Sequence, residues 1–347
     1  MSAAFAPQAA TLPLLEELLR IVERGPAELQ AQSLGEVEAA GSRWPLLAVS
    51  LGNPDPSLPA VVYVGGVHGL ERIGAEVVLA YLGSLVMRLP WDGLLRAQLE
   101  RQRLVFMPLV NPAGLWLGTR ANPQGIDLMR NAPLDAEEPA AFMVGGQRIS
   151  AGLPWYRGES GAPMAPESQA LCELVERESR DRLFTLALDC HSGFGLSDRI
   201  WFPYAGSSRP MPHLAEVHAL VELMDRCQAQ HPYVVEPQSR QYLAHGDLWD
   251  HLYRHACSRS SGLLLPLTLE MGSWLWIKKN PRQLLTRHGI FNPLIAHRQQ
   301  RVLRRHMAWL DFMGRVACSA AHWLPRGEDR RPHEQAALAR WFRRTGA

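Results

Sequence analysis

The sequence predicts one three-layer α/β/α domain with a mixed, mostly parallel sheet at its centre. Apolar runs of strand length alternate along the chain with segments whose apolar residues recur at helical spacing. Three of these runs lead to histidine or carboxylate side chains, at residues 68–71, 191 and 270. Ligands of such sheets bind beyond the carboxyl ends of the strands, so these side chains form the candidate site.

The expected elements can be placed in chain order. Alternating residues 36–52, with a turn at 53–56, predict a hairpin that leads into the strand at 61–64. Residues 132–166 are rich in Gly and Pro and predict a long loop, a kind of segment that commonly shapes a pocket. Further strands are expected over 104–110, 186–191 and 262–271, and helices over 12–24, 73–88, 166–180 and 212–229.

We divide the chain into three segments. Residues 1–45 are an N-terminal helix and lead-in, residues 46–325 the domain that carries the candidate site, and residues 326–347 a basic tail that is either a short helix or partly disordered. Beyond Trp276 the chain becomes helical and basic. We interpret the arginines there as a solvated helix face rather than as a binding surface for an acidic partner.

Composition is that of an ordinary globular protein. The 347 residues are 47% hydrophobic and 20% charged, and a formal charge of +2 gives no indication of a nucleic-acid or membrane partner.

Five cysteines without CxxC spacing predict scattered, mostly buried thiols. Glu16, Glu17 and Glu23 interrupt the first apolar segment, which therefore resembles an amphipathic helix and not a signal peptide. With no apolar run of about 18 residues, we expect a cytoplasmic chain, of undetermined oligomeric state.

The most informative stretch follows the strand at residues 61–64. Gly65 and Gly66 break the strand, and His68 and Glu71 lie three positions apart where the next helix begins. The glycines let the backbone bend so that both side chains converge. An imidazole nitrogen and a carboxylate oxygen suit Zn²⁺, which needs a third ligand from elsewhere. Such a pair alone is common on protein surfaces, but three further stretches accompany it: LALDCHSG at 186–193, LTLEMG at 267–272, and a segment with NP at 111–112, Arg120 and GIDLMRN at 125–131.

Taken together, these motifs resemble the zinc carboxypeptidase family of carboxypeptidase A-like metallopeptidases. That family has HxxE, an NPDG…R…GVDLNRN segment, a strand-end His and a strand-end Glu, in the order found here over residues 45–275. The resemblance implies the family's fold and zinc-dependent hydrolysis of peptide bonds. It implies one Zn²⁺ per chain, held by His68, Glu71 and His191 with a fourth position left for water.

The resemblance also implies roles for six further residues. Glu270 matches the general base that takes a proton from zinc-activated water, and Arg120 the arginine that polarises the scissile carbonyl. Asp127 matches the carboxylate that orients a zinc-bound histidine. The substrate-binding positions correspond to Arg130, Asn131 and Tyr242.

One departure bears on the substrate. Met129 stands where the family has Asn, which puts recognition of a free C-terminal carboxylate in doubt. The motif spacing also resembles bacterial members that trim cell-wall peptides, so a murein-peptide amidase is one version of the function. We expect a peptide or a small amino-acid-derived substrate, with the preferred side chain left open.

Two alternatives remain. A deacylase of N-acyl amino acids, similar to succinylglutamate desuccinylase and aspartoacylase, would use the same metal. A non-catalytic binding module on the same scaffold is the other. The NPxG-like segment, the strand-end His191 and the distant Tyr242 favour the peptidase. The chain keeps the three predicted zinc ligands and the predicted base, which argues against a family member that has lost its catalytic activity.

The remaining histidines have no predicted ligand role. His251 and His255 are four positions apart, a spacing that can bind metal, but no nearby carboxylate motif accompanies them. We expect the same of eight others, which are His213, His218, His231, His288, His297, His306, His322 and His333.

Overall fold

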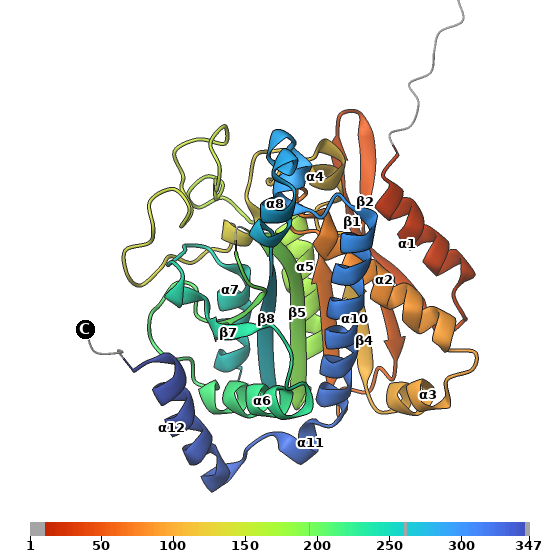
Figure 1. Cartoon of the computed structure of the whole chain (residues 1–347), viewed down its shortest axis with the longest axis vertical. Coiled ribbons are helices and arrows are strands. Elements are labelled where there is room, and N and C mark those ends of the chain that lie inside the picture. The colour runs from red at the N-terminus through yellow and green to blue at the C-terminus, as the bar shows by residue number, and fades with distance from the viewer. Residues whose placement is uncertain (1–10, 194, 260–261, 344–347) are drawn as a thin grey trace, which may run out of the picture.

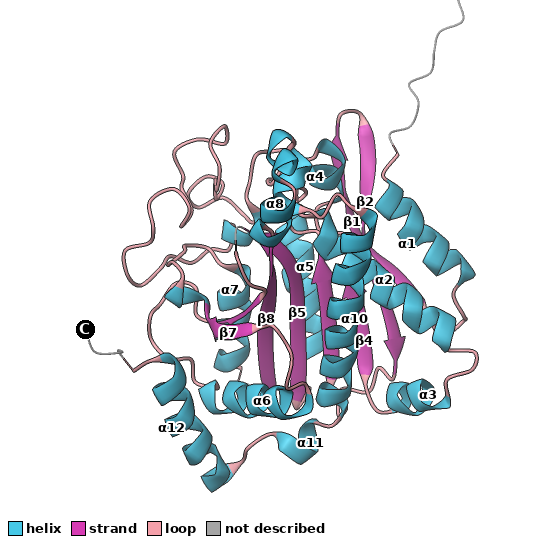
Figure 2. Ribbon diagram, in the orientation of Figure 1, coloured by secondary structure: helices cyan, strands magenta, loops and turns pink. Residues whose placement is uncertain are grey.

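A computed structural model describes residues 11–193, 195–259 and 262–343, and Figures 1 and 2 show its helices, strands and loops. The strands are β1 (Gln30–Ala39), β2 (Ser42–Gly52), β3 (Ala60–Gly65), β4 (Arg103–Met107), β5 (Phe184–Gly193), β6 (Arg199–Phe202), β7 (Val234–Pro237) and β8 (Leu263–Gly272). The α-helices are α1 (Pro13–Arg24), α2 (Arg72–Arg88), α3 (Gly93–Glu100), α4 (Pro112–Leu117), α5 (Pro166–Ser179), α6 (Leu214–Cys227), α7 (Leu248–Ser258), α8 (Trp274–Lys279), α9 (Arg287–Phe291), α10 (Ala296–Cys318), α11 (Ala320–Trp323) and α12 (Arg330–Trp341).

Among the described residues the strands form one sheet in the order β1-β2-β4-β3-β5-β8-β6-β7. The central strands β4, β3, β5 and β8 run parallel, whereas β2 and β6 pair antiparallel with their inner neighbours. Helices α2 and α10 pack on one face, and α5 and α7 on the other (Figure 1). This mixed three-layer architecture confirms the predicted fold class.

The apolar composition of the central strands explains their position. Every residue of β3 is buried, and so is every residue of β5 up to Ser192, because helices cover both faces of a parallel sheet. The carboxyl ends of these strands point to the top of Figure 1, where α4 and α8 follow β4 and β8. His68, His191 and Glu270 therefore lie at one edge of the sheet.

The predicted hairpin forms, but its turn was misplaced. Ala39 pairs with Ser42, so Ala40 and Gly41 form a two-residue turn, with φ angles of 49° and 76°. Positive φ at both central residues is the geometry that matches the twist of a hairpin. The Pro-rich residues 53–56 form the loop that leads to β3, and β2 pairs with β4 rather than with β3.

The C-terminal segment is a structured part of the molecule within the described residues. Helix α12 packs against α6, and Trp341 at its end is 3% exposed. The Trp341 indole packs edge-on against Phe202 of β6, and its Nε1 donates a hydrogen bond to the carbonyl oxygen of Val235 at 2.8 Å. Of the predicted tail, residues 330–341 are helix, and this helix covers the end of the sheet at β6 and β7.

Two further expectations can be compared with the structure. All five cysteines are free thiols, but only Cys172 and Cys190 are buried, so the expectation that most are buried was wrong. In the described part of the chain no single helix is long and apolar enough to span a membrane; α2 and α3 would qualify only as a pair, and they are bent by 109°.

We expect Trp341→Ala to lower the free energy of unfolding by about 3–5 kcal/mol, the usual cost of deleting a buried Trp side chain. Trp341→Phe, which keeps a ring but loses the hydrogen bond, should cost less. The exposed Trp91→Ala, at 74% exposure, is the matched control and should change stability by no more than about 0.5 kcal/mol. Urea denaturation measures all three, and an unchanged midpoint for Trp341→Ala would show that α12 is dispensable.

Candidate metal centre and active site

Three side chains from two parts of the chain converge beyond the ends of β3 and β5. His68 follows β3, Glu71 immediately precedes α2, and His191 lies on β5. The Nδ1 atom of His68 lies 2.9 Å from Glu71 Oε1 and 3.2 Å from His191 Nδ1, and His191 Nδ1 lies 3.0 Å from Glu71 Oε2. All three side chains are buried. The structure therefore brings together the three residues predicted to bind zinc, His68, Glu71 and His191.

Two buried aspartates hold the other side of each imidazole. His68 Nε2 lies 3.0 Å from Asp127 Oδ1, and His191 Nε2 lies 2.7 Å from Asp189 Oδ2. A histidine that donates its Nε2–H to a carboxylate leaves the Nδ1 lone pair free for a metal. Both Nδ1 atoms therefore point at the same place as the Glu71 carboxylate.

This donor set fits a zinc ion. Ligands at about 2.0–2.1 Å from a tetrahedral Zn²⁺ are about 3.3 Å apart, close to the separations of 2.9–3.2 Å found here. The charge agrees as well. Three buried carboxyl groups, those of Glu71, Asp127 and Asp189, surround the two imidazoles, and such an acidic environment favours a bound dication.

Arg120 completes the charged cluster. Its Nε donates to Asp127 Oδ2 at 2.8 Å, and its Nη1 donates to Glu71 Oε1 at 3.1 Å. Burial raises the pKa of Asp127 and Glu71, but the charge of Arg120 on Asp127, and of His68 on Glu71, outweighs it, so both carboxyl pKa values lie well below their usual range. Both groups are therefore carboxylates at neutral pH. The Arg120 side chain stays 25% exposed, so it is accessible to a substrate.

Two glycines allow α2 to approach β5 and α4 closely enough for this geometry. A Cβ atom on Gly74, in the first turn of α2, would lie 2.0 Å from the carbonyl oxygen of Cys190 in β5. A Cβ on Gly69, between His68 and Glu71, would lie 2.0 Å from the backbone carbon of Gly114 in α4. Any side chain at either position would push the ligand-bearing segments apart.

Glu270 lies next to the predicted metal ligands. It pairs with His191 in the register of β5 and β8, and a Cβ on Gly193 would lie only 2.9 Å from its Oε2. Burial raises the pKa of Glu270 to about 7, and the nearby Glu71 carboxylate acts in the same direction. A bound dication would favour the charged form. Among the described residues no group donates a hydrogen bond to this carboxylate, which leaves it free to exchange a proton.

A sequence comparison decides which family this arrangement belongs to. The model of a family described as zinc carboxypeptidase matches residues 41–263, more than half of the chain. The chain belongs to the zinc carboxypeptidase family. This membership supports a metallocarboxypeptidase-like hydrolase, as the sequence motifs predict, and gives no support to the deacylase or binding-module alternatives.

Known relatives agree with this assignment. Carboxypeptidase SOL1 of Arabidopsis thaliana is 35% identical over 75 residues, which make up 22% of this chain and 15% of that protein. The matched region spans less than a sixth of the length of each curated relative.

Two solved structures show the same fold. Thrombin activatable fibrinolysis inhibitor aligns with a TM-score of 0.65 at 18% identity, covering 92% of this chain and 76% of that one. Carboxypeptidase A from Helicoverpa armigera aligns with a TM-score of 0.60 at 17% identity, covering 89% and 72%. At such identities the likeness establishes the fold alone.

Two of the three predicted substrate-binding residues of this zinc carboxypeptidase family member, Arg130 and Tyr242, contact each other. Arg130 is 3% exposed, and its Nη2 donates to the Tyr242 hydroxyl at 3.0 Å. Its Nη1 lies 4.0 Å from the buried carboxylate of Asp247. Arg130 thus already faces the carboxyl group of Asp247, and the hydroxyl that it binds belongs to a side chain that is partly exposed.

Asn131 is placed differently from the substrate-binding role predicted for it. Its Nδ2 donates to the carbonyl oxygen of Arg157 at 2.9 Å, and its Oδ1 accepts from the backbone N–H of Ala165 at 2.6 Å. Both ends of the amide are therefore engaged with the 132–165 loop. In this structure Asn131 holds that loop rather than facing a ligand.

Asp189 and Trp249 belong to the site without having a predicted role. The Trp249 indole Nε1 donates to Asp189 Oδ2 at 2.9 Å, which fixes the carboxylate that orients His191. Asp189 stands two positions before His191, so strand periodicity places it on the same face, and this signal could have found it. Trp249, on a helix that the sequence did not predict, had no such signal.

A cavity of about 520 Å³ opens beside Arg120 and Asp127. Its wall also includes Leu70, Trp155 and Phe291, which are side chains from three separate segments. A second cavity of about 550 Å³ lies between Leu58, Leu183 and Leu324, and its lining includes no predicted site residue. Of these two cavities, the one beside Arg120 borders predicted site residues, namely Arg120 and Asp127.

We expect His68→Ala and His191→Ala to abolish tight zinc binding, because each removes one of three ligands. Asp189→Asn should retain zinc with an affinity about 10- to 100-fold lower, since the aspartate orients His191 without binding the ion. Chelator competition measures these affinities. Asp92→Asn, at a helix N-cap remote from the site, is the control. Unchanged zinc occupancy in His68→Ala would rule out this metal centre.

Proposed function

We propose that this protein hydrolyses peptide bonds with one Zn²⁺ held by His68, Glu71 and His191. The observation on which the proposal rests is the convergence of both Nδ1 atoms and the Glu71 carboxylate, with Glu270 and Arg120 beside them. When bound, zinc supplies Lewis acidity and lowers the pKa of water. The three ligands leave a coordination position open, as in catalytic rather than structural zinc sites.

Glu270 is the candidate general base and acid. Its carboxylate is not a ligand in this arrangement, and it pairs across the sheet with the ligand His191. It takes a proton from the attacking water and returns one to the leaving amine. A group with a pKa near the working pH serves well in both directions, and burial moves the pKa of Glu270 towards that range.

Arg120 is the candidate stabiliser of negative charge on the scissile carbonyl oxygen. Two carboxylates, Asp127 and Glu71, hold its guanidinium in place before substrate arrives. A donor that is already oriented costs no reorganisation during the reaction, which is where such groups contribute most. The cavity beside Arg120 gives the substrate backbone a path to it.

Arg130 is the candidate group for a substrate carboxylate. The carboxylate would replace the Tyr242 hydroxyl at Nη2, and Tyr242 would move aside or close over it. Met129 is buried and offers no amide, so recognition here relies on the guanidinium without the second side chain that the family pattern supplies. We therefore propose a peptidase with relaxed demand for a free C-terminus, which includes the murein-peptide version of the function.

The proposed function is tested with the zinc-loaded protein on three substrate classes. Peptides with a free C-terminus, murein peptides and N-acyl amino acids separate the peptidase, the amidase and the deacylase. Cleavage of N-acyl amino acids alone, or of none of the three, would contradict the proposal.

Glu270→Gln should lower kcat by about 10²- to 10⁴-fold with little change in KM, because Gln keeps the size but cannot accept a proton. Zinc content and melting temperature should stay near those of the parent. Glu173→Gln, on the exposed face of α5, is the matched control and should leave all three quantities unchanged. If Glu270 were a fourth ligand or a structural ion-pair partner, zinc or stability would be lost instead.

Arg130→Ala should raise KM for substrates with a free carboxylate by about 10- to 150-fold, the effect of losing a charge-assisted hydrogen bond. The same variant should have little effect on a C-terminally amidated substrate. Steady-state kinetics on the matched acid and amide measure the difference. Equal cleavage of acid and amide by the parent protein would remove Arg130 from carboxylate recognition.

A further inference from the structure

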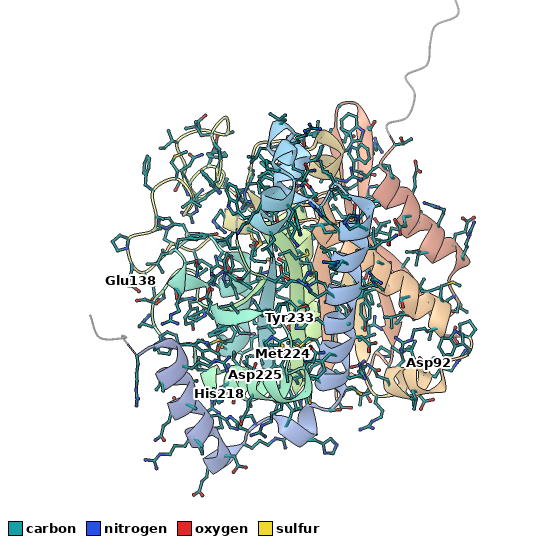
Figure 3. All side chains as sticks on the ribbon, viewed as in Figure 1. Asp92, Glu138, His218, Met224, Asp225 and Tyr233 are labelled. Atoms are coloured by element: carbon teal, nitrogen blue, oxygen red, sulfur yellow. The ribbon has the colours of Figure 1, made fainter. Side chains whose placement is uncertain are left out.

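A second cluster of metal-binding side chains lies outside the catalytic centre, between α6 and α12. His218 and Glu222 stand four residues apart on α6, and His333 faces them from α12. Figure 3 labels His218 where the two helices approach each other. All three are partly exposed, and one donor atom of each lies within 4.8 Å of the others.

The donor atoms have the spacing of a metal site. His218 Nδ1 lies 3.0 Å from His333 Nδ1, and His333 Nδ1 lies 3.7 Å from Glu222 Oε2. One of these distances is shorter and the other longer than the distance of about 3.3 Å expected between two ligand atoms of a tetrahedral zinc ion. The catalytic trio has the same pattern, two Nδ1 atoms facing each other and a carboxylate oxygen beside them. We propose that His218, Glu222 and His333 bind a divalent transition metal ion that joins α12 to α6.

The simplest alternative is a hydrogen bond between two neutral imidazoles. It accounts for the 3.0 Å contact between His218 and His333, but it does not require Glu222 to face the same point. Residues four apart on a helix lie on one face, so His218 and Glu222 present their donors together to α12. The two explanations differ in whether added metal changes the protein.

Two arginines nearby contact carboxylates, and one of these carboxylates is that of Glu222 itself. Arg226 contacts Glu222 through Oε1, which leaves Oε2 turned towards His333. Arg340 donates to Asp225 Oδ2 at 3.0 Å. A bound cation would therefore not face an unpaired guanidinium from either of these residues.

The chemistry of the donors indicates which ions would bind and how tightly. Two imidazoles and one carboxylate favour zinc, nickel or copper over magnesium or calcium. Within the described residues, neither His218 nor His333 has its Nε2 held by a buried aspartate, as both catalytic histidines have. Such partners are worth about 10- to 100-fold in affinity, so we expect weaker binding here than at the catalytic centre.

The position of the cluster suggests a structural role. Helix α12 is attached at its start by Arg330, whose Nε donates to Glu216 Oε1 at 2.7 Å, and at its end by Trp341, which bonds to Val235. His333 lies in the first turn, so a metal there would add a link between the helices. An ion that binds only the folded state stabilises it as its concentration rises.

Equilibrium dialysis of the untagged zinc-loaded protein against about 1–100 µM free Zn²⁺ tests the proposal. Elemental analysis should show bound zinc rising from one to two ions per chain. The His218→Ala/His333→Ala double variant should stop at one and keep its catalytic activity. His255→Ala, at a partly exposed helix position whose imidazole bonds to Glu176, should behave as the parent does.

Hydrogen exchange of residues 330–341 provides the second readout. Added zinc should slow exchange there in the parent but not in the double variant, and an unchanged melting temperature without added zinc would show that the variant is folded. His68→Ala should lose the first zinc and keep the second, so the two sites are read separately. A parent that saturates at one ion, a double variant that still binds two, or an α12 that does not respond would each overturn the proposal.

Discussion

The burial of the Glu71 carboxylate is the constraint on which the rest of the site depends. A charge removed from water costs several kcal/mol unless partners surround it. Here the partners are the two imidazoles, the Arg120 guanidinium and the backbone N–H of Ser192, which donates to Oε2 at 3.0 Å. Asp127 and Asp189 add two more acidic groups behind the histidines, and this acidic environment favours a bound cation. The electrostatics and the ligand geometry therefore point to the same ion.

The site also requires close backbone packing, since the predicted ligands Glu71 and His191 are 120 residues apart in the sequence. Glu71 and His191 can share a metal only if the start of α2 touches β5, and a contact between helix backbone and strand backbone leaves no room for a side chain. Gly74 satisfies this condition against Cys190, as Gly69 does against α4. Small residues at these contacts thus set the distance between donors as directly as the ligands do.

The substrate side of the site depends on a different network. Arg157, 4% exposed, donates to the carbonyl oxygens of Leu134 and Arg130 and to the carboxylate of Asp135. Asn131 then holds the backbone of Arg157. The long loop over 132–165 is thereby attached to the segment that bears Arg130, so substrate recognition and loop position are linked.

The family, the fold class, the candidate zinc ligands and most of the elements could be predicted from the sequence. His68, Glu71, His191 and Glu270 could be found because each follows or ends an apolar strand, and strand ends in such a sheet meet at one edge. The hairpin turn at Ala40 and Gly41, the use of Asn131 by the loop backbone, and the approach of His218 to His333 were decided only by the tertiary structure. Periodicity reports which face of an element a residue occupies. It does not report which distant element packs there, because that choice depends on side-chain fit across the whole core.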